Sequence, residues 1–90
     1  MSTPTDDYLD GNAAAGELSA IFAVDITAAH GQCASCGSMK RFAEAHVYAQ
    51  APGFVARCAQ CDAVLLRYVR TGERVMIEAR GLSFLAFDTA

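Results

Sequence analysis

The first third of this 90-residue chain lacks basic residues, and the whole chain lacks a long apolar run. Residues 1–29 hold five acidic residues and no basic one (net −5), whereas residues 30–90 hold seven basic and five acidic residues (net +2). Nucleic-acid binders typically carry a much stronger basic field. No segment approaches the roughly 18 apolar residues of a membrane span, and the polar, acidic start is unlike a secretory signal. We therefore expect a cytoplasmic protein without membrane contact.

Four cysteines form two pairs with identical internal spacing, within residues 33–36 and 58–61. In a reducing cytosol such cysteines favour metal ligation over disulfide formation. Two sulfurs separated by two residues can turn toward one ion, and two such knuckles joined by a hairpin supply the closed tetrahedral set of a structural zinc site. Each knuckle needs a positive φ after its second cysteine, which Gly37 adopts freely and Asp62 tolerates. The sequence thus predicts one structural Zn²⁺ and no catalytic residue, with these metal ligands: Cys33, Cys36, Cys58 and Cys61.

The two histidines are assigned no catalytic or metal-binding role. His30 lies three residues before Cys33 and offers an alternative ligand, but four thiolates already fill a tetrahedron. His46 falls in an alternating segment, where a half-exposed position on a sheet is favoured over a catalytic base. We therefore expect no enzyme activity at either residue.

The remaining pattern predicts a small metal-bound β-rich domain, a rubredoxin-like zinc ribbon whose antiparallel sheet follows one N-terminal α-helix. Residues 1–9 are predicted as a flexible acidic tail and residues 10–90 as a single domain. Asp10-Gly11-Asn12 can start a helix, and an apolar stripe predicts that helix over about 12–24. A short β-leaning segment, 25–30, leads into the first cysteine pair. Alternation and turn signals predict strands at about 43–50, 54–57, 64–71 and 74–80, the last with Val75, Ile77 and Ala79 inward.

A binding or adaptor role is favoured, because no catalytic constellation accompanies the cysteines. The metal would hold a sheet whose exposed face or helix docks a protein partner. The predicted face carries aromatic and arginine side chains, which are enriched among interface hot spots: Tyr48, Arg57, Arg67, Tyr68 and Arg70. The final apolar patch, Leu82–Phe87, closes the core or forms a homodimer contact, and the sequence leaves both open.

Two other function classes stay open. Nucleic-acid binding would use several arginines on phosphates and Tyr48 or Tyr68 for base stacking, but the acidity of the chain and the absence of lysine after Lys40 disfavour it. Rubredoxin-like electron transfer would place iron in the same four sulfurs, because ligand geometry alone does not separate iron from zinc. The lack of an aromatic-rich core disfavours iron. A redox dithiol enzyme would want a βαβ context that this pattern lacks.

The order of these motifs resembles a family of small, uncharacterised bacterial zinc-ribbon proteins, commonest in high-GC Gram-positive bacteria. The resemblance runs from about Tyr8 to Phe87 and includes the 9–12 opening, the first knuckle, the Val47-Tyr48 strand and the run 58–67. It implies a zinc ribbon with a preceding helix and brings no established activity. Ala59 departs from the proline expected after the third cysteine, which loosens the second knuckle slightly without threatening ligation.

Overall fold

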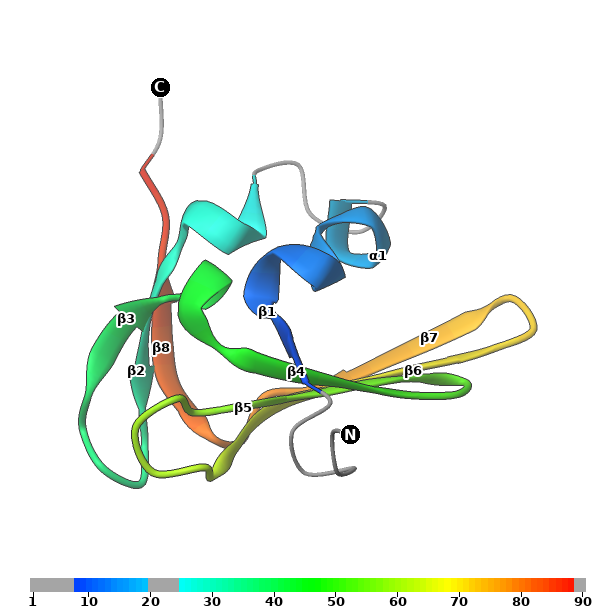
Figure 1. Ribbon diagram of the computed structural model, residues 1–90. Helices are drawn as coiled ribbons and strands as arrows, with labels where there is room; N and C mark the ends of the chain where they lie inside the picture. Colours follow the sequence, from blue (N-terminus) through cyan, green and yellow to red (C-terminus); the bar gives the residue numbers. More distant parts are fainter. Residues whose placement is uncertain (1–7, 20–24, 89–90) are drawn as a thin grey trace.

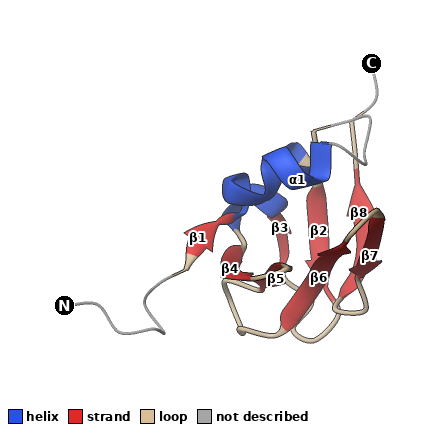
Figure 2. Cartoon of the chain, turned by 90° about the vertical axis from the view of Figure 1, so that its right-hand side faces the viewer, coloured by secondary structure: helices blue, strands red, loops and turns tan. Residues whose placement is uncertain are grey.

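Two antiparallel sheets and a short helical segment make up residues 8–19 and 25–88, the part of the chain that the computed structural model describes. The larger sheet has five strands in the order β1-β4-β5-β6-β7, and the smaller has three in the order β3-β2-β8. The helical segment lies over one side of the larger sheet (Figure 1 and Figure 2). The strands are β1 (Leu9–Asp10), β2 (His30–Cys33), β3 (Met39–Arg41), β4 (His46–Gln50), β5 (Gly53–Arg57), β6 (Val64–Thr71), β7 (Arg74–Glu78) and β8 (Leu82–Ala86), and the helix is α1 (Ala15–Ser19).

The N-terminal helical segment starts at the predicted cap but differs from the predicted helix. The Asp10 side chain accepts a hydrogen bond from the Asn12 backbone N–H at 3.0 Å, which satisfies one free amide of the first turn. Gly11–Ala14 then form a 3-10 turn (η2) before α1 begins, and residues 20–24 of the predicted helix lie outside the described residues. Residues 1–7 of the predicted tail also lie outside them. Its last residue, Leu9, belongs to β1 because it pairs with Val47 of β4.

The strand limits differ from the prediction where short 3-10 turns intervene. The strand predicted at 43–50 begins only at His46, because Phe42–Glu44 form a 3-10 turn (η4). In this turn the Glu44 carboxylate accepts a hydrogen bond from the Arg41 backbone N–H at 3.0 Å, and the Phe42 ring is buried. The segment 25–30 is likewise not a continuous strand, because Ile26–Ala28 form a 3-10 turn (η3). Burial of one apolar side chain in each turn stabilises these departures from local β preference.

The last part of the chain leaves the larger sheet and completes the smaller one. The strand predicted at 74–80 ends at Glu78, where a turn leads into β8. β8 pairs antiparallel with β2, and Leu82, Leu85 and Phe87 pack against the buried core. The C-terminal apolar patch therefore closes the core of the same molecule, while Phe84 stays partly exposed.

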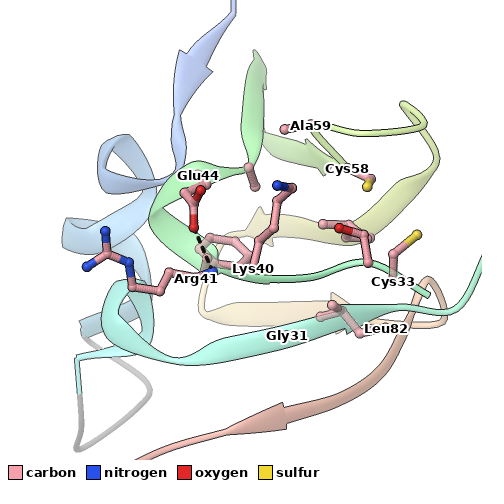
Figure 3. A pocket seen from close by; sticks show the side chains of 12 residues that line it. Gly31, Cys33, Lys40, Arg41, Glu44, Cys58, Ala59 and Leu82 are labelled. Atoms are coloured by element: carbon pink, nitrogen blue, oxygen red, sulfur yellow. Dashed lines mark hydrogen bonds between the residues drawn. The ribbon is translucent and has the colours of Figure 1, made fainter. Parts of the chain in front are cut away.

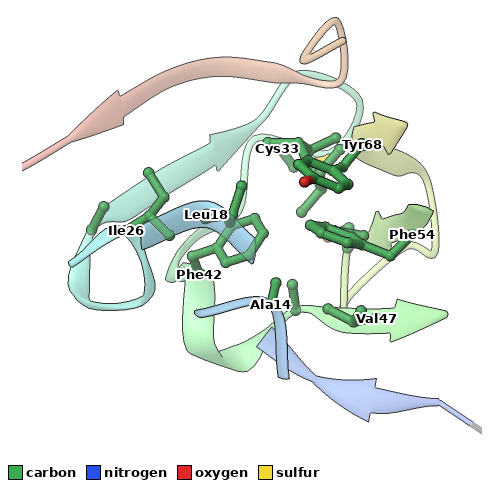
Figure 4. Close-up of a cluster of buried hydrophobic side chains, with 14 residues drawn as sticks. Ala14, Leu18, Ile26, Cys33, Phe42, Val47, Phe54 and Tyr68 are labelled. Atoms are coloured by element: carbon green, nitrogen blue, oxygen red, sulfur yellow. The ribbon is translucent and has the colours of Figure 1, made fainter. Parts of the chain in front are cut away.

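The core fills the space between the helical segment and the inner face of the larger sheet (Figure 4). Leu18 and Ile26 enter it from the helical side, and Phe54 and Tyr68 from β5 and β6. The rings of Phe54 and Tyr68 stack at 5.0 Å between centroids. β7 contributes Ile77 to this core. Val75, near the turn of the hairpin, and Ala79, just after the end of β7, were also predicted to face inward but are exposed. Among the described residues, no helix is long and apolar enough to cross a membrane.

Candidate metal centre

Each cysteine pair lies in a tight turn between two strands, and the two turns have the same backbone pattern. The Gly37 N–H donates to the Cys33 carbonyl at 2.9 Å, and the Asp62 N–H donates to the Cys58 carbonyl at 2.9 Å. Gly37 has φ 75° and Asp62 has φ 67°, as the sequence predicts. A left-handed residue at this point reverses the chain after the second cysteine of each pair. Both sulfurs of a pair are thereby directed to one side of the turn.

The two turns bring the four sulfurs together in a closed cluster. The Sγ atoms of Cys33 and Cys61 are 3.7 Å apart, those of Cys36 and Cys58 are 3.8 Å apart, and all four lie within 4.8 Å of one another. A tetrahedron with metal–sulfur distances of about 2.3 Å separates its sulfurs by about 3.8 Å. The four cysteines could therefore hold one metal ion with little rearrangement.

The thiols of the first pair illustrate the electrostatics of this cluster. Burial raises the pKa of Cys33, but hydrogen bonds from the backbone N–H groups of Cys36 and Ser35 and from neighbouring thiols lower it, leaving the pKa at about 7. The Ser38 N–H lowers the pKa of Cys36, but burial and the other three sulfurs raise that pKa to about 11. Adjacent sulfurs resist joint ionisation because their negative charges repel. A bound cation would offset this repulsion and release the remaining thiol protons.

A small cavity adjoins the two buried cysteines, Cys33 and Cys58 (Figure 3). Its volume is about 20 Å³, enough for roughly one water molecule. Lys40 lines this cavity together with the two cysteines. No role is predicted for Lys40 from the sequence, although this single lysine of the chain lies only three residues after Gly37 of the first knuckle.

Both histidines lie outside the sulfur cluster. His30 is exposed at the start of β2, and His46 is half-buried on β4, where its ring stacks on that of Tyr8 at 3.7 Å. Tyr8 also approaches Tyr48, with 6.0 Å between ring centroids. This aromatic group could not be predicted from the pattern, because Tyr8 falls in the segment predicted as a flexible tail. The pairing of β1 with β4 places it there.

The five residues of the predicted contact face do not share one face. Val55 of β5 lies opposite Tyr48 of β4 on one side and opposite Arg67 of β6 on the other, so these three residues share one face of the sheet. Arg57 lies on the same face, with its guanidinium carbon 5.9 Å from the centroid of the Tyr48 ring. We call Tyr8, His46, Tyr48, Arg57 and Arg67 the outer face.

Tyr68 and Arg70 belong to the opposite, inner face of the sheet. Only 2% of Tyr68 is exposed, and its hydroxyl donates to the Glu17 carboxylate at 3.0 Å. Both residues line an open groove of about 390 Å³ between the helical segment and the sheet. The prediction for Tyr68 is therefore wrong, because adjacent residues of a strand point to opposite faces and its neighbour Arg67 is exposed.

Comparison with known proteins identifies a family but no activity. No curated protein and no solved structure matches the chain. A family of unknown function (DUF6510) matches residues 5–90, which include both cysteine pairs, the helical segment and all eight strands. The chain belongs to this family of unknown function.

Proposed function

We propose that the chain is a zinc ribbon that works as a binding module: one structural Zn²⁺ holds the fold, and the outer face docks a protein partner. The observation that carries the metal assignment is the closed cluster of four sulfurs within 4.8 Å of one another. The zinc-ribbon family that the sequence resembles supports zinc over iron. Four free thiols also fit the reducing cytoplasm better than an oxidising compartment.

The composition of the site supports a structural role for the metal. Four thiolates complete a tetrahedral zinc site and leave no open position for a water nucleophile. Cys33 and Cys58 are members of the buried core cluster, so the metal would join the end of β2 to the end of β5 at the edge of the core. Structural zinc contributes about 10–16 kcal/mol at neutral pH, as much as the whole stability of a small domain. The proposed role is therefore to stabilise the fold.

The outer face has the chemistry of a protein-docking surface. It presents stacked aromatic rings beside two arginines, side-chain types that are enriched at protein interfaces. Each of the two arginines lies 3.9 Å from a carboxylate, Arg57 from Asp62 and Arg67 from Glu78. These ion pairs offset the positive charge that a nucleic-acid phosphate would require. The pairing favours a protein partner over a nucleic acid.

The metal is tested by elemental analysis of the purified protein together with its visible absorption spectrum. We expect about one zinc per chain and no colour, whereas a red protein with iron would support the rubredoxin alternative. Cys58→Ser should lose the metal and unfold or aggregate. Ser35→Ala, in the first knuckle but not a ligand, is the matched control and should keep both metal and fold. Unchanged thermal unfolding of Cys58→Ser would contradict the structural role.

The docking face is tested with variants that keep the metal. Tyr48→Ser combined with Arg67→Ala removes an aromatic ring and a guanidinium from the outer face, and the control Arg80→Ala removes a guanidinium from the exposed turn before β8. A direct protein partner should bind the double variant at least about tenfold more weakly and the control normally, since truncation of interface hot spots costs about 2 kcal/mol or more. Binding of DNA or RNA that weakens steeply with salt would instead support the nucleic-acid alternative.

A further inference from the structure

β7 forms a free edge of the larger sheet. It is the last strand in the sheet order, and within the described residues it pairs only with β6. Figure 1 shows the β6–β7 hairpin projecting away from the helical segment and from the smaller sheet. The outer side of β7 is therefore open to another strand.

The outward backbone groups of β7 belong to two apolar residues. Thr71 and Arg74 pair across the two-residue turn Gly72-Glu73, and such a flanking pair exchanges hydrogen bonds within the hairpin. Alternation along the strand then directs the N–H and C=O groups of Val75 and Ile77 outward. Free edges of this kind template pairing with another chain unless proline, charged side chains (lysine above all), a bulge or a covering element protects them. The two charged residues of β7, Arg74 and Glu78, stand at its ends and leave its middle unprotected. β7 contains no proline or lysine, and its register with β6 has no irregularity.

The side chains of β7 add exposed apolar surface to this edge. Met76 is 56% exposed and Val75 is 37% exposed. Arg74 and Glu78 flank them at the two ends of the strand, with opposite charges. The strand is thus apolar in its middle and oppositely charged at its ends.

We propose that two copies of the protein associate through β7, paired antiparallel about a two-fold axis at Met76. This register places Arg74 of one copy opposite Glu78 of the second copy, and Val75 opposite Ile77 of the second copy. The two opposite-charge pairs arise together by symmetry, because an isologous interface repeats each contact. The apolar pair consists of the residues whose backbone groups point outward, so both strands can exchange hydrogen bonds there.

Neighbouring registers lack this complementarity. Centring the pair on Val75 would place Arg74 opposite Met76, and centring it on Ile77 would place Glu78 opposite Met76. Either shift loses both charge pairs, and opposite charges across a strand pair are stabilising. Glu78 already contacts Arg80 at 3.5 Å and Arg67 at 3.9 Å, but its side chain remains 41% exposed, so it is open to a third guanidinium.

The arrangement has a consequence for the proposed docking surface. A two-fold axis perpendicular to the sheet keeps the same side of both copies facing the same way. The two outer faces would then form one continuous surface that binds two identical sites, which raises avidity without new contacts. A contact of one strand pair is small, so the dimer should be weak.

Charge reversal tests the pairing. The metal-loaded protein is measured by sedimentation velocity from about 10 µM to about 1 mM, the concentration range suited to a weak interface. Wild type should show concentration-dependent dimers. Arg74→Glu and Glu78→Arg should each raise the dimer dissociation constant about tenfold or more, because both pairs become repulsive. An equimolar mixture of the two variants should associate again as a heterodimer, because both pairs are then of opposite charge. The two substituted side chains face each other in one pair, and the native Glu78 of the first variant faces the native Arg74 of the second variant in the other. Metal content and thermal midpoint confirm that each variant is folded.

Cross-linking tests the register independently. Met76→Cys should form a disulfide-linked dimer with oxidised glutathione in the presence of Zn²⁺, because a non-hydrogen-bonded pair on the axis brings the two Cα atoms to about 4.5 Å. Met39→Cys is the matched control, with Met39 55% exposed in the other sheet. A wild type that stays monomeric at about 1 mM, a mixture that associates no better than its components, or equal cross-linking at both positions would overturn the proposal. If the wild type stays monomeric, the free edge of β7 would instead be open to pairing with an extended peptide of another protein.

Discussion

Removal of one hydroxyl from Tyr68 tests how the helical segment is attached to the sheet. Tyr68→Phe keeps the buried ring and its stacking on Phe54, at 5.0 Å between centroids. It deletes only the hydrogen bond of 3.0 Å from the hydroxyl to the Glu17 carboxylate, which joins β6 to α1 across the core. Within residues 8–19 and 25–88 no second hydrogen bond or ion pair joins these two elements, so the substitution isolates the contribution of one contact.

The magnitude follows from the exposure of the two partners. A hydrogen bond to a charged group contributes about 1.5–3 kcal/mol when both partners are buried. Glu17 is exposed, so its carboxylate can be rehydrated in the variant, and the expected loss falls to about 1 kcal/mol. For a domain of this size that loss lowers the thermal midpoint by about 4–8 °C. Tyr68→Ala would also remove the packed ring and should cost about 3–5 kcal/mol.

The assay is denaturant unfolding with excess Zn²⁺, so that all variants carry equal metal. Tyr48→Phe is the matched control on the outer face, where the expected change is below about 0.5 kcal/mol. Equal stability of wild type and Tyr68→Phe would refute the contribution of the Glu17 contact. A loss as large as that of Tyr68→Ala would show that the hydroxyl controls the packing of the whole helical segment.

Four further predictions concern the backbone and the core. Gly81→Ala should cost more than about 2 kcal/mol in the free energy of unfolding, because a Cβ there would lie 1.7 Å from the Val64 carbonyl oxygen. Gly16→Ala in α1, where a Cβ would meet nothing within 4 Å, should gain about 0.5–1 kcal/mol. Asp62→Val should lower the free energy of unfolding by about 1–2 kcal/mol and weaken metal retention, because a φ of 67° is strained for a β-branched residue. The control Asp62→Gly should keep the metal, because glycine adopts this φ freely. Leu18→Ala, at a fully buried position, should lower the free energy of unfolding by about 2–5 kcal/mol. Thermal unfolding and metal analysis of each variant check these four predictions.

The knuckles could be predicted from sequence because their geometry is local. Each depends on two cysteines three positions apart and on one residue with positive φ directly after them. The backbone of about five residues fixes all these features, and no distant contact is needed to explain them. The hairpin of β6 and β7 is local for the same reason, since alternation and a two-residue turn specify it.

The contact face could be predicted only in part, and one error was avoidable. Arg67 and Tyr68 are neighbours in β6, so they cannot share a face. Which of the two faces inward depends on register with β5, where Phe54 lies opposite Tyr68 and Val55 lies opposite Arg67. Hydrophobicity gives little guidance here, because a tyrosine serves equally as a core or a surface residue.

The sequence by itself determined a β-rich chain with a four-cysteine cluster, because ligand spacing, turn residues and alternation act over a few neighbouring positions. Only the tertiary structure decided that β8 returns to pair with β2, that Leu9 is drawn into the sheet beside Val47, and that β7 is left as a free edge. Pairings between distant segments depend on which apolar surfaces remain to be buried once the local elements have formed. That balance is a property of the whole core and is not encoded in any single window of the chain.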